Sequence, residues 1–524
     1  MMHFQRPRYW LELEHAITPY NFLQSVADAC GWLRYSLPMR HKKYVRLNPP
    51  VSDLASLPHG TKPMQPQRQA RRLLRSARWW MPILVLLGIV ASCGGGGGGG
   101  SGSEQTAASP SAIASGPSGT APNTGGAPST PSSSTATTLT TAGITTNPPT
   151  SPTTAVSPQP AGPLTVTELA TTLTSPWGMA FLPDARVLVT ERGGTLRIVS
   201  AAGTVSAAIS GVPAVDARGQ GGLLDVVLDP AYASNQRIYL SYAKPGGDAA
   251  GTSHTAVARA VLNEATFALS QVTVIFEQLP KVVSQGHFGS RLVFDKNGYL
   301  FVTLGDRQTN EQRGFAQDLA RGNGKVVRIT TDGAPAPGNP SLGAGAQPGI
   351  WSYGHRNPQG AALHPSTGEL WVNEHGAQGG DELNLSLAGQ NYGWPLASYS
   401  QEYGTTTPVS TTSLPGMRLP VSYWLTRDGS PYTGGSQSSI APSGMAIYAG
   451  SKFPEFEGNV FLGALAGTAL WRVVLGGADG RTEVYRERLL AARGERIRDV
   501  RTGPDGWIYL LTDTSPGKLL RVSK

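Results

Sequence analysis

Three short polar segments, each rich in glycine, contain most of the side chains that could do chemistry. They are Ser284–Arg291 (SQGHFGSR), Tyr353–Gly360 (YGHRNPQG) and Glu374–Asn384 (EHGAQGGDELN). An imidazole can move a proton near pH 7, a guanidinium can hold negative charge, and carboxylate and carbonyl oxygens are the ligands that calcium prefers. Polar residues on the connections between strands are more often functional than packing residues. The sequence therefore predicts a functional site built from such connections.

The elements that must position these segments are β-strands. An apolar strand, a turn of Asp, Pro, Gly or Asn type and a second apolar strand recur six times after Pro163. Six hairpins in the 361 residues from Leu164 to Lys524 give roughly 60 residues per unit, enough for a propeller blade with long loops. We predict an all-β, six-bladed β-propeller, with a pair of β-sandwiches as the alternative. The repeats begin at Gly178, Leu223, Arg291, Gly360, Gly444 and Ile497.

Two segments of this region are long for connections, Arg307–Gly349 and Ala397–Ser443. A propeller collects its functional loops around one mouth of the central channel, so we expect these two segments to build the site. No amphipathic helix of more than about three turns is expected after Pro163.

Charge and cysteine content exclude some classes of function. The formal net charge is +9, but much of it comes from the N-terminal stretch, and no basic run of similar density follows Cys93. The charge balance therefore gives no support for a nucleic-acid partner. The two cysteines are Cys30 and Cys93, so nothing after Cys93 can form a disulfide or a thiolate metal site.

A secretory signal is indicated upstream of the repeats. Five arginines in Arg68–Arg78 precede the apolar run Met81–Ala91, which is too short to span a bilayer. The ending VASC resembles a bacterial lipobox, in which Cys93 would be lipidated and become the mature N-terminus; an ordinary signal peptide is the alternative. Gly94 in place of Asp favours the outer membrane, so we expect a lipid-anchored protein on the periplasmic face of a Gram-negative bacterium.

The chain therefore divides into four predicted parts. Residues 1–63 precede the signal and are expected not to be translated, with Met64 as the start; a genuine cytosolic extension is the alternative. Residues 64–92 are the lipoprotein signal peptide. Residues 93–163 are rich in Gly, Ser, Thr and Pro with almost no charge, so we expect a disordered tether. Residues 164–524 are the propeller domain.

At the level of ordered motifs, the repeat region resembles the soluble pyrroloquinoline quinone (PQQ)-dependent sugar dehydrogenases, the glucose/sorbosone dehydrogenase family. The strings SPWGMAFLPD, GQGGLLDVVLDP, GHFGSRLVFDKNGYLFVTLGDR, YGHRNPQG, EHGAQGGDELN, NYGWP and RIRDVRTGPDG follow one another in family order from Ser175 to Asp513. The resemblance implies a six-bladed propeller, in agreement with the repeat count. It also implies that PQQ and Ca²⁺ serve the oxidation of aldoses at the anomeric carbon, with hydride passing to PQQ and a lactone as product.

The resemblance also assigns roles near the reacting carbon. His287 matches the catalytic base, since a neutral imidazole can take the hydroxyl proton; a structural histidine in a turn is the alternative. Arg356 and Asn357 match the pair beside the quinone, where a guanidinium can hold negative charge; a salt bridge between blades is the alternative for Arg356. Gln220 matches a cofactor-contacting glutamine, and Tyr403 is expected to line the cofactor.

Further roles concern calcium and the cofactor carboxylates. Glu382, by side chain, and Tyr392, through its carbonyl, match calcium positions, and the alternative is that Asp381 and Glu382 are solvated turn residues. Arg496 and Arg498 alternate on an expected strand and resemble the pair that binds PQQ carboxylates. Two solvent-facing arginines are the alternative.

The sequence departs from the family in two places. Where the family has a lysine near the quinone, the run Gly463–Thr468 (GALAGT) has no cation, and Gly286 replaces an Asp of the glucose-oxidising branch. Losing the lysine could cost about 1–3 kcal/mol of PQQ binding. The alternative function is accordingly a lipid-tethered, non-catalytic propeller that binds a glycan or protein. A zinc hydrolase built on His287, His355, His364 and His375 lacks the usual ligand spacings.

For the enzyme, the expected partners are a small-molecule aldose, an electron acceptor that the sequence does not identify, and a membrane contacted only through the lipid anchor.

Overall fold

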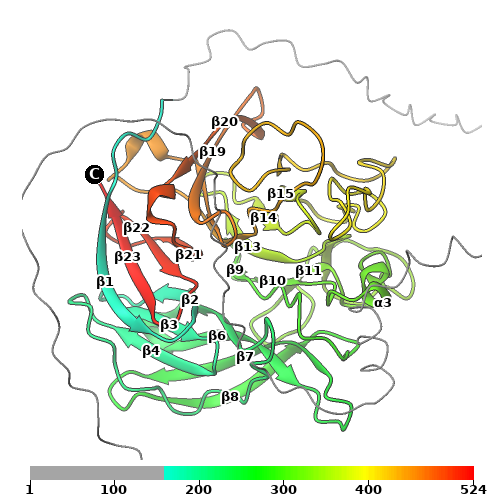
Figure 1. The fold of residues 1–524 in the computed structure, drawn as a ribbon. Coiled ribbons are helices and arrows are strands. Elements are labelled where there is room, and N and C mark those ends of the chain that lie inside the picture. Colours follow the sequence, from blue (N-terminus) through cyan, green and yellow to red (C-terminus); the bar gives the residue numbers. More distant parts are fainter. Residues whose placement is uncertain (1–158) are drawn as a thin grey trace, which may run out of the picture. The chain divides into compact units, whose positions relative to one another are not determined.

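The six predicted repeats each form the two innermost strands of one antiparallel sheet. The computed structural model describes residues 159–524, and these residues fold as a six-bladed β-propeller (Figure 1). The innermost strands contact one another in a closed ring around the axis. They are β2 (Pro176–Phe181), β5 (Leu223–Leu228), β9 (Leu292–Phe294), β13 (Pro358–Leu363), β17 (Pro442–Ile447) and β21 (Ile497–Thr502).

The outer strands follow in chain order within five of the blades. The first blade adds β3 (Val187–Glu191) and β4 (Thr195–Val199), and the second adds β6 (Arg237–Pro245), β7 (Ser253–Asn263) and β8 (Ala268–Glu277). The third adds β10 (Leu300–Leu304), β11 (Lys325–Ile329) and β12 (Ile350–Tyr353). The fourth adds β14 (Leu370–Glu374), β15 (Asp381–Ser386) and β16 (Ser422–Trp424), and the fifth adds β18 (Val460–Ala464), β19 (Ala469–Gly476) and β20 (Thr482–Leu489).

The last blade joins the two ends of the described chain. Its inner strand β21 is followed by β22 (Ile508–Thr512) and β23 (Gly517–Ser523), and β1 (Thr165–Leu173) pairs antiparallel with β23 as the outermost strand. Lys518 and Arg493 make ion pairs with Glu168 of β1. The propeller is therefore closed by pairing of strands from opposite ends of the sequence, which leaves no unpaired inner edge.

The core lies between the blades, and this explains why many strands are apolar throughout. Every residue of β10 is buried, as is every residue of β18 and β22. Alternate side chains point to opposite faces of a sheet, and here both faces pack against a neighbouring blade. The alternation expected from RVLVT and YLFVT thus separates two buried faces rather than a buried and a solvated one.

The helical content is small, as predicted: α2 (Tyr232–Asn235) and α3 (Asn310–Arg313) have four residues each. The two long segments are not single loops, because the first contains β11 and the second contains β16. The sequence did not predict these two short strands, because they lie within long polar segments rich in turn residues. The connections that remain, 305–324 between β10 and β11 and 387–421 between β15 and β16, both reach the site described below.

No helix within residues 159–524 is long and apolar enough to cross a membrane. The predicted upstream extension, the predicted signal peptide, the predicted lipidation site Cys93 and most of the predicted tether lie outside the described residues.

Candidate active site

His287 lies on the connection between β8 and β9, in a backbone conformation that is unusual for a residue with a side chain. Its φ is +48°, and its backbone N–H donates to Oε1 of Gln220 at 2.9 Å. Gly305 at the end of β10 packs so closely that a Cβ there would lie 1.9 Å from the His287 carbonyl oxygen. The loop is therefore fixed against its neighbours, and such strained positions cluster at functional sites.

The imidazole of His287 is hydrogen-bonded through Nδ1, and its Nε2 has no partner within residues 159–524. Its Nδ1 lies 2.7 Å from Oδ1 of Asp306, and the side chain is buried. Burial, followed by the nearby Arg356 guanidinium, holds the pKa of His287 below its usual value, although Asp306 opposes this effect. The ring is then neutral at pH 7 with Nδ1–H donating to Asp306, which leaves the Nε2 lone pair to accept a proton.

Asp306 is the partner that orients this base, and it was not among the predicted site residues. Its Oδ2 accepts from Trp394 Nε1 at 2.8 Å, and its Oδ1 accepts from the Gln308 backbone N–H at 2.7 Å. Burial disfavours its charge, but His287, the Arg356 guanidinium and the Gln308 N–H together outweigh burial, so the pKa of Asp306 is lowered. An ionised Asp306 can stabilise the imidazolium that forms when His287 takes a proton.

Arg307 clamps the loop that carries His287. Its guanidinium donates to the carbonyl oxygens of Gly286 (3.0 Å), Ser253 (2.8 Å) and Ser284 (2.7 Å), and it stacks over the Phe288 ring at 3.9 Å. Arg307 is fully buried without a carboxylate hydrogen-bonded to it among the described residues. Arg307 therefore holds the loop that carries His287 in place.

Arg356 presents a buried cation close to His287. Its Nη1 donates to the His375 carbonyl at 3.2 Å and its Nη2 to Tyr403 Oη at 2.9 Å, while its Nε has no partner in residues 159–524. Within the described chain it makes no ion pair, so the predicted alternative of an inter-blade salt bridge is wrong. Tyr403 itself is 62 % exposed. It touches Arg356 rather than lining an enclosed cavity.

Asn357, the next residue after Arg356, is also buried. Its Oδ1 accepts from the Gly289 backbone N–H at 3.2 Å, which ties it to the loop of His287. Its Nδ2 is buried and has no acceptor within the described residues. Buried donors without partners are rare, and an unpaired donor here is one that a bound acceptor could satisfy.

A cavity of about 240 Å³ lies at the start of the inner strands, beside this group. Arg192, Arg496 and Arg498 line it, and so do Trp177 and Gln220, the residue that holds the backbone of His287. Arg498 is buried and donates to Gln359 Oε1 at 2.8 Å. The cavity thus offers several cations and the face of an aromatic ring to an anionic ligand.

The two predicted arginines do converge here, with one correction to the local structure. Arg496 precedes β21 instead of lying on it, and the register shifts between Ile497 and Asp499. Both guanidinium groups nevertheless meet one carboxylate: Arg496 Nη2 lies 2.6 Å from Asp513 Oδ2, and Arg498 Nη2 lies 2.8 Å from Asp513 Oδ1. Asp513, like Arg192, was not predicted as a site residue.

His375 lines both this cavity and a second, smaller one. Burial, followed by the charges of Arg356 and neighbouring groups, lowers its pKa to about 3, so it stays neutral. Its Nε2 lies 2.6 Å from the Pro442 carbonyl and donates to it. A neutral, anchored His375 separates two charged sites without adding charge of its own.

The smaller cavity, of about 10 Å³, holds the predicted calcium ligands and has room for one water-sized occupant. Glu374 and Glu382 both line it, and Asn384 Nδ2 donates to a carboxylate oxygen of each at 3.1 Å. Burial, followed by the repulsion of Glu374, raises the pKa of Glu382 to about 8. Two carboxylates that share one amide are a donor set that a divalent cation would relieve.

Tyr392 also lines this small cavity, while its hydroxyl is engaged elsewhere. The hydroxyl donates to the Leu385 carbonyl and accepts from the Leu387 backbone N–H, which leaves the Tyr392 carbonyl as its candidate ligand. Asp381 and Glu382 lie in β15, and Asp381 accepts from Ser439 and Ile440, so the alternative of solvated turn residues is wrong. No group of three or more His, Cys, Asp or Glu side chains within residues 159–524 is placed to hold a metal.

The donor set of the larger cavity fits a planar anion such as PQQ. Three lining arginines and Gln220 supply positive charge and hydrogen bonds. Arg356 lines the smaller cavity instead, and it and Asn357 each keep a buried donor without a partner in the described residues. Leu465, at the end of the FxGAL motif that the family lysine follows, lines the cavity, and its carbonyl accepts from Arg496 at 3.1 Å. Arg192 is an additional cation, on the connection after β3, that the sequence alone did not single out.

Comparisons with known proteins identify the family of the propeller domain. The family described as glucose/sorbosone dehydrogenase matches residues 173–521. The aldose sugar dehydrogenase YliI of Escherichia coli is 46 % identical over 355 residues, which is 67 % of this chain and 90 % of that protein. The apo crystal structure of the soluble aldose sugar dehydrogenase of Escherichia coli superposes with a TM-score of 0.63 at 45 % identity, covering 69 % of this chain and 99 % of that chain.

A solved structure with a bound cofactor is also similar. The PQQ-bound form of an aldose sugar dehydrogenase from Streptomyces coelicolor superposes with a TM-score of 0.56 at 30 % identity. The match covers 70 % of this chain and 99 % of that chain.

Proposed function

Since the chain belongs to the glucose/sorbosone dehydrogenase family and is an oxidoreductase that acts on sugar CH–OH groups, we propose that it oxidises aldoses at the anomeric carbon with PQQ and Ca²⁺. The observation that carries this proposal is the neutral, Asp306-paired imidazole of His287 beside the unpaired cation of Arg356. A base and a fixed positive charge are what removal of a hydroxyl proton with departure of a hydride requires.

Each site residue has a proposed role in proton transfer or in cofactor binding. His287 Nε2 takes the proton of the anomeric hydroxyl, and Asp306 stabilises the resulting imidazolium. PQQ, when bound, supplies the two-electron acceptor for the hydride. Arg356 and Asn357 would hold the reacting end of the cofactor, Gln220 its edge, and Arg192, Arg496 and Arg498 its carboxylates. The sugar would leave as a lactone, because its anomeric carbon has lost a hydride and its anomeric hydroxyl a proton.

Calcium is assigned to the smaller cavity. Glu374 and Glu382 would be its carboxylate ligands, and the Tyr392 carbonyl would add a third oxygen. The ion would act as a Lewis acid and offset the charge of the two buried carboxylates.

Reconstitution tests the proposal. Purified apo-protein is mixed with PQQ and Ca²⁺, and reduction of an artificial electron-accepting dye is followed with a panel of aldoses, with the lactone identified by mass spectrometry. We expect dye reduction that requires PQQ, Ca²⁺ and an aldose together. Absence of dye reduction, with no quinone absorbance retained after desalting, would support the non-catalytic binding propeller instead.

We also propose that the propeller is held to the periplasmic face of a membrane, by lipid on Cys93 and the tether 93–163. The support is the VASC sequence after the apolar run Met81–Ala91. Metabolic labelling with an alkyne fatty acid should label the wild-type protein and fail to label Cys93→Ala. Labelling of that variant would exclude Cys93 as the lipid anchor.

A further inference from the structure

A second large cavity lies at the other end of the inner strands, away from the candidate active site. Its volume is about 440 Å³, and its lining consists of the last residues of all six inner strands. No residue lines both this cavity and the arginine-rich cavity. We call it the distal cavity. It is lined by Met179–Phe181, Val226–Leu228, Leu292–Phe294, Ala361–Leu363, Met445–Ile447, Arg501 and Thr502.

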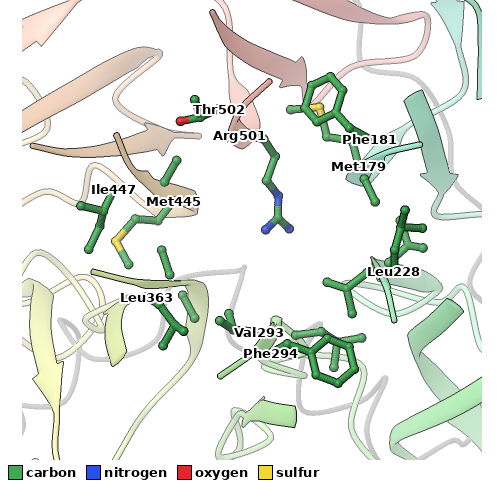
Figure 2. A pocket seen from close by; sticks show the side chains of 17 residues that line it. Met179, Phe181, Leu228, Val293, Phe294, Leu363, Met445, Ile447, Arg501 and Thr502 are labelled. Atoms are coloured by element: carbon green, nitrogen blue, oxygen red, sulfur yellow. The ribbon is translucent and has the colours of Figure 1, made fainter. Parts of the chain in front are cut away.

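The wall of the distal cavity is apolar and only partly covered. Figure 2 shows Phe181, Leu228, Phe294 and Leu363 placed around the opening. All four side chains are half-buried, so they keep contact with solvent. The rings of Phe181 and Phe294 also pack edge to face on Tyr509 and Tyr239. Ligand sites typically have volumes of about 300–1,000 Å³, an apolar lining and a few polar groups that fix orientation, and this cavity fits that description.

The single charged group of the distal cavity is Arg501. In Figure 2 its guanidinium projects into the middle of the opening. Nε donates to Asp499 at 3.1 Å and Nη2 to Asp225 at 2.9 Å, while Nη1 has no acceptor among the described residues. The side chain is 19 % exposed. A donor of this kind at the floor of an apolar cavity would bind the head group of an amphiphile.

A layer of buried charges divides the distal cavity from the active site. Arg291 makes ion pairs with Asp225 and Asp499, both at 3.0 Å, and stacks over Trp177 at 4.3 Å. Trp177 in turn lines the arginine-rich cavity. Arg501 is therefore held from behind by a rigid network, and a ligand in the distal cavity would not touch the sugar-oxidising groups.

We propose that the distal cavity binds a single-chain anionic amphiphile, with its carboxylate on Arg501 and its alkyl chain against the surrounding apolar side chains. The carboxylate would accept hydrogen bonds from Nη1 and the outer N–H of Nη2. The alkyl chain would cover Phe181, Leu228, Phe294 and Leu363. Arg501 makes ion pairs with Asp225 and Asp499, so its remaining N–H groups and not a free net charge set the preference. These N–H groups favour a carboxylate, the stronger hydrogen-bond acceptor, over an alcohol of equal length.

Calorimetric titration of the full-length protein without cofactor tests this directly. Decanoate below its micelle-forming concentration should bind saturably, and each CH₂ removed should weaken binding about fourfold. Decan-1-ol should bind at least tenfold more weakly than decanoate. Equal binding of acid and alcohol would refute the role of Arg501, and absence of saturable decanoate binding would refute the site.

Two matched variants test whether decanoate binds in the distal cavity. Val293→Glu adds a carboxylate to the cavity wall, and Val484→Glu makes the same change on the outermost strand β20, where Val484 is 47 % exposed. Decanoate binding should be lost in Val293→Glu and retained in Val484→Glu, with aldose oxidation by the reconstituted enzyme unchanged in both. Equal decanoate binding in the two variants would overturn the proposal.

A labelling experiment on the wild-type chain avoids any dependence on the folding of a variant. A decanoate that carries a photoreactive diazirine should label peptides from the ends of β9, β13 or β17. Labelling confined to other surfaces would contradict the assignment.

Discussion

Replacement of Asp306 by Asn tests the proposed base most sharply, because three hydrogen-bond donors meet on this one carboxylate. Oδ1 accepts from His287 Nδ1 and the Gln308 N–H, and Oδ2 accepts from Trp394 Nε1. An amide has only one oxygen. If its NH₂ faces Trp394, two donors oppose each other; if it faces His287, the proton of the imidazole must move to Nε2, and the base is lost.

The expected loss follows from the value of a positioned general base, about 10²–10⁴ in rate. We expect kcat/KM of Asp306→Asn to fall by that factor, equivalent to about 2.7–5.4 kcal/mol of transition-state stabilisation. PQQ binding, followed by quinone absorbance after desalting, should be retained. Asp332→Asn is the matched control, because Asp332 is a 76 % exposed partner of Arg259 far from His287 in the fold.

The pH profile gives an independent readout of the same pair. Only neutral His287 can act as base, so activity is present above its pKa and is lost as pH falls through it. Burial and Arg356 lower this pKa while Asp306 raises it. The acid limb of kcat/KM should therefore lie below about pH 6.5 in the wild type and move to still lower pH in Asp306→Asn. A variant within threefold of wild-type kcat/KM, with an unmoved acid limb, would refute the pairing.

Three further variants probe the base, its loop and the calcium site. His287→Gln should abolish turnover with PQQ binding intact, and equal dye reduction would remove His287 as the base. Arg307→Met removes the donor to the buried Gly286 carbonyl, whereas the Ser253 and Ser284 carbonyls keep second donors. It should therefore lower the free energy of unfolding by about 1–3 kcal/mol, measured by urea denaturation; an unchanged midpoint would contradict the clamp. Glu382→Gln should weaken Ca²⁺ binding, measured calorimetrically, at least tenfold, and a chelator should inactivate the wild type reversibly; equal affinity would exclude Glu382 as a ligand.

The repeat pattern was enough to predict the blades, because a hairpin is a local structure. Strand pairs such as β9 and β10 are joined by the turn Asp295–Gly298, whose residue types are visible in the sequence. β11 and β16 were missed, because short strands within long polar segments carry little periodic signal. The resemblance to the family likewise predicted residues that lie within the family's motifs, such as His287 and Arg356.

The partners of these residues were missed because they are distant in sequence. Asp306 stands in the quoted string VTLGDR, directly after the buried strand β10, yet its role depends on Trp394, 88 residues away. Its position directly after a strongly apolar strand was the one feature of the sequence that could have marked Asp306 as a site residue. No sequence signal marked Asp513 or Arg192 as site residues. The two lie in the last and first blades, which reach the same cavity only because the ring of blades closes.

The missing family lysine can be reconsidered in terms of the charges that remain. Arg192, Arg496 and Arg498 bring three positive charges to the cavity wall, and Asp513 removes one of them. Arg192 donates to the Gly219 carbonyl at 2.6 Å and the Gly221 carbonyl at 3.3 Å, and no carboxylate of residues 159–524 pairs with it, so its charge remains available to a ligand. A buried or partly buried cation paired only with carbonyls attracts an anion more strongly than one already neutralised by an ion pair. Loss of the family lysine therefore changes where the cations stand around the cavity, and we expect the remaining arginines to hold a polyanionic cofactor.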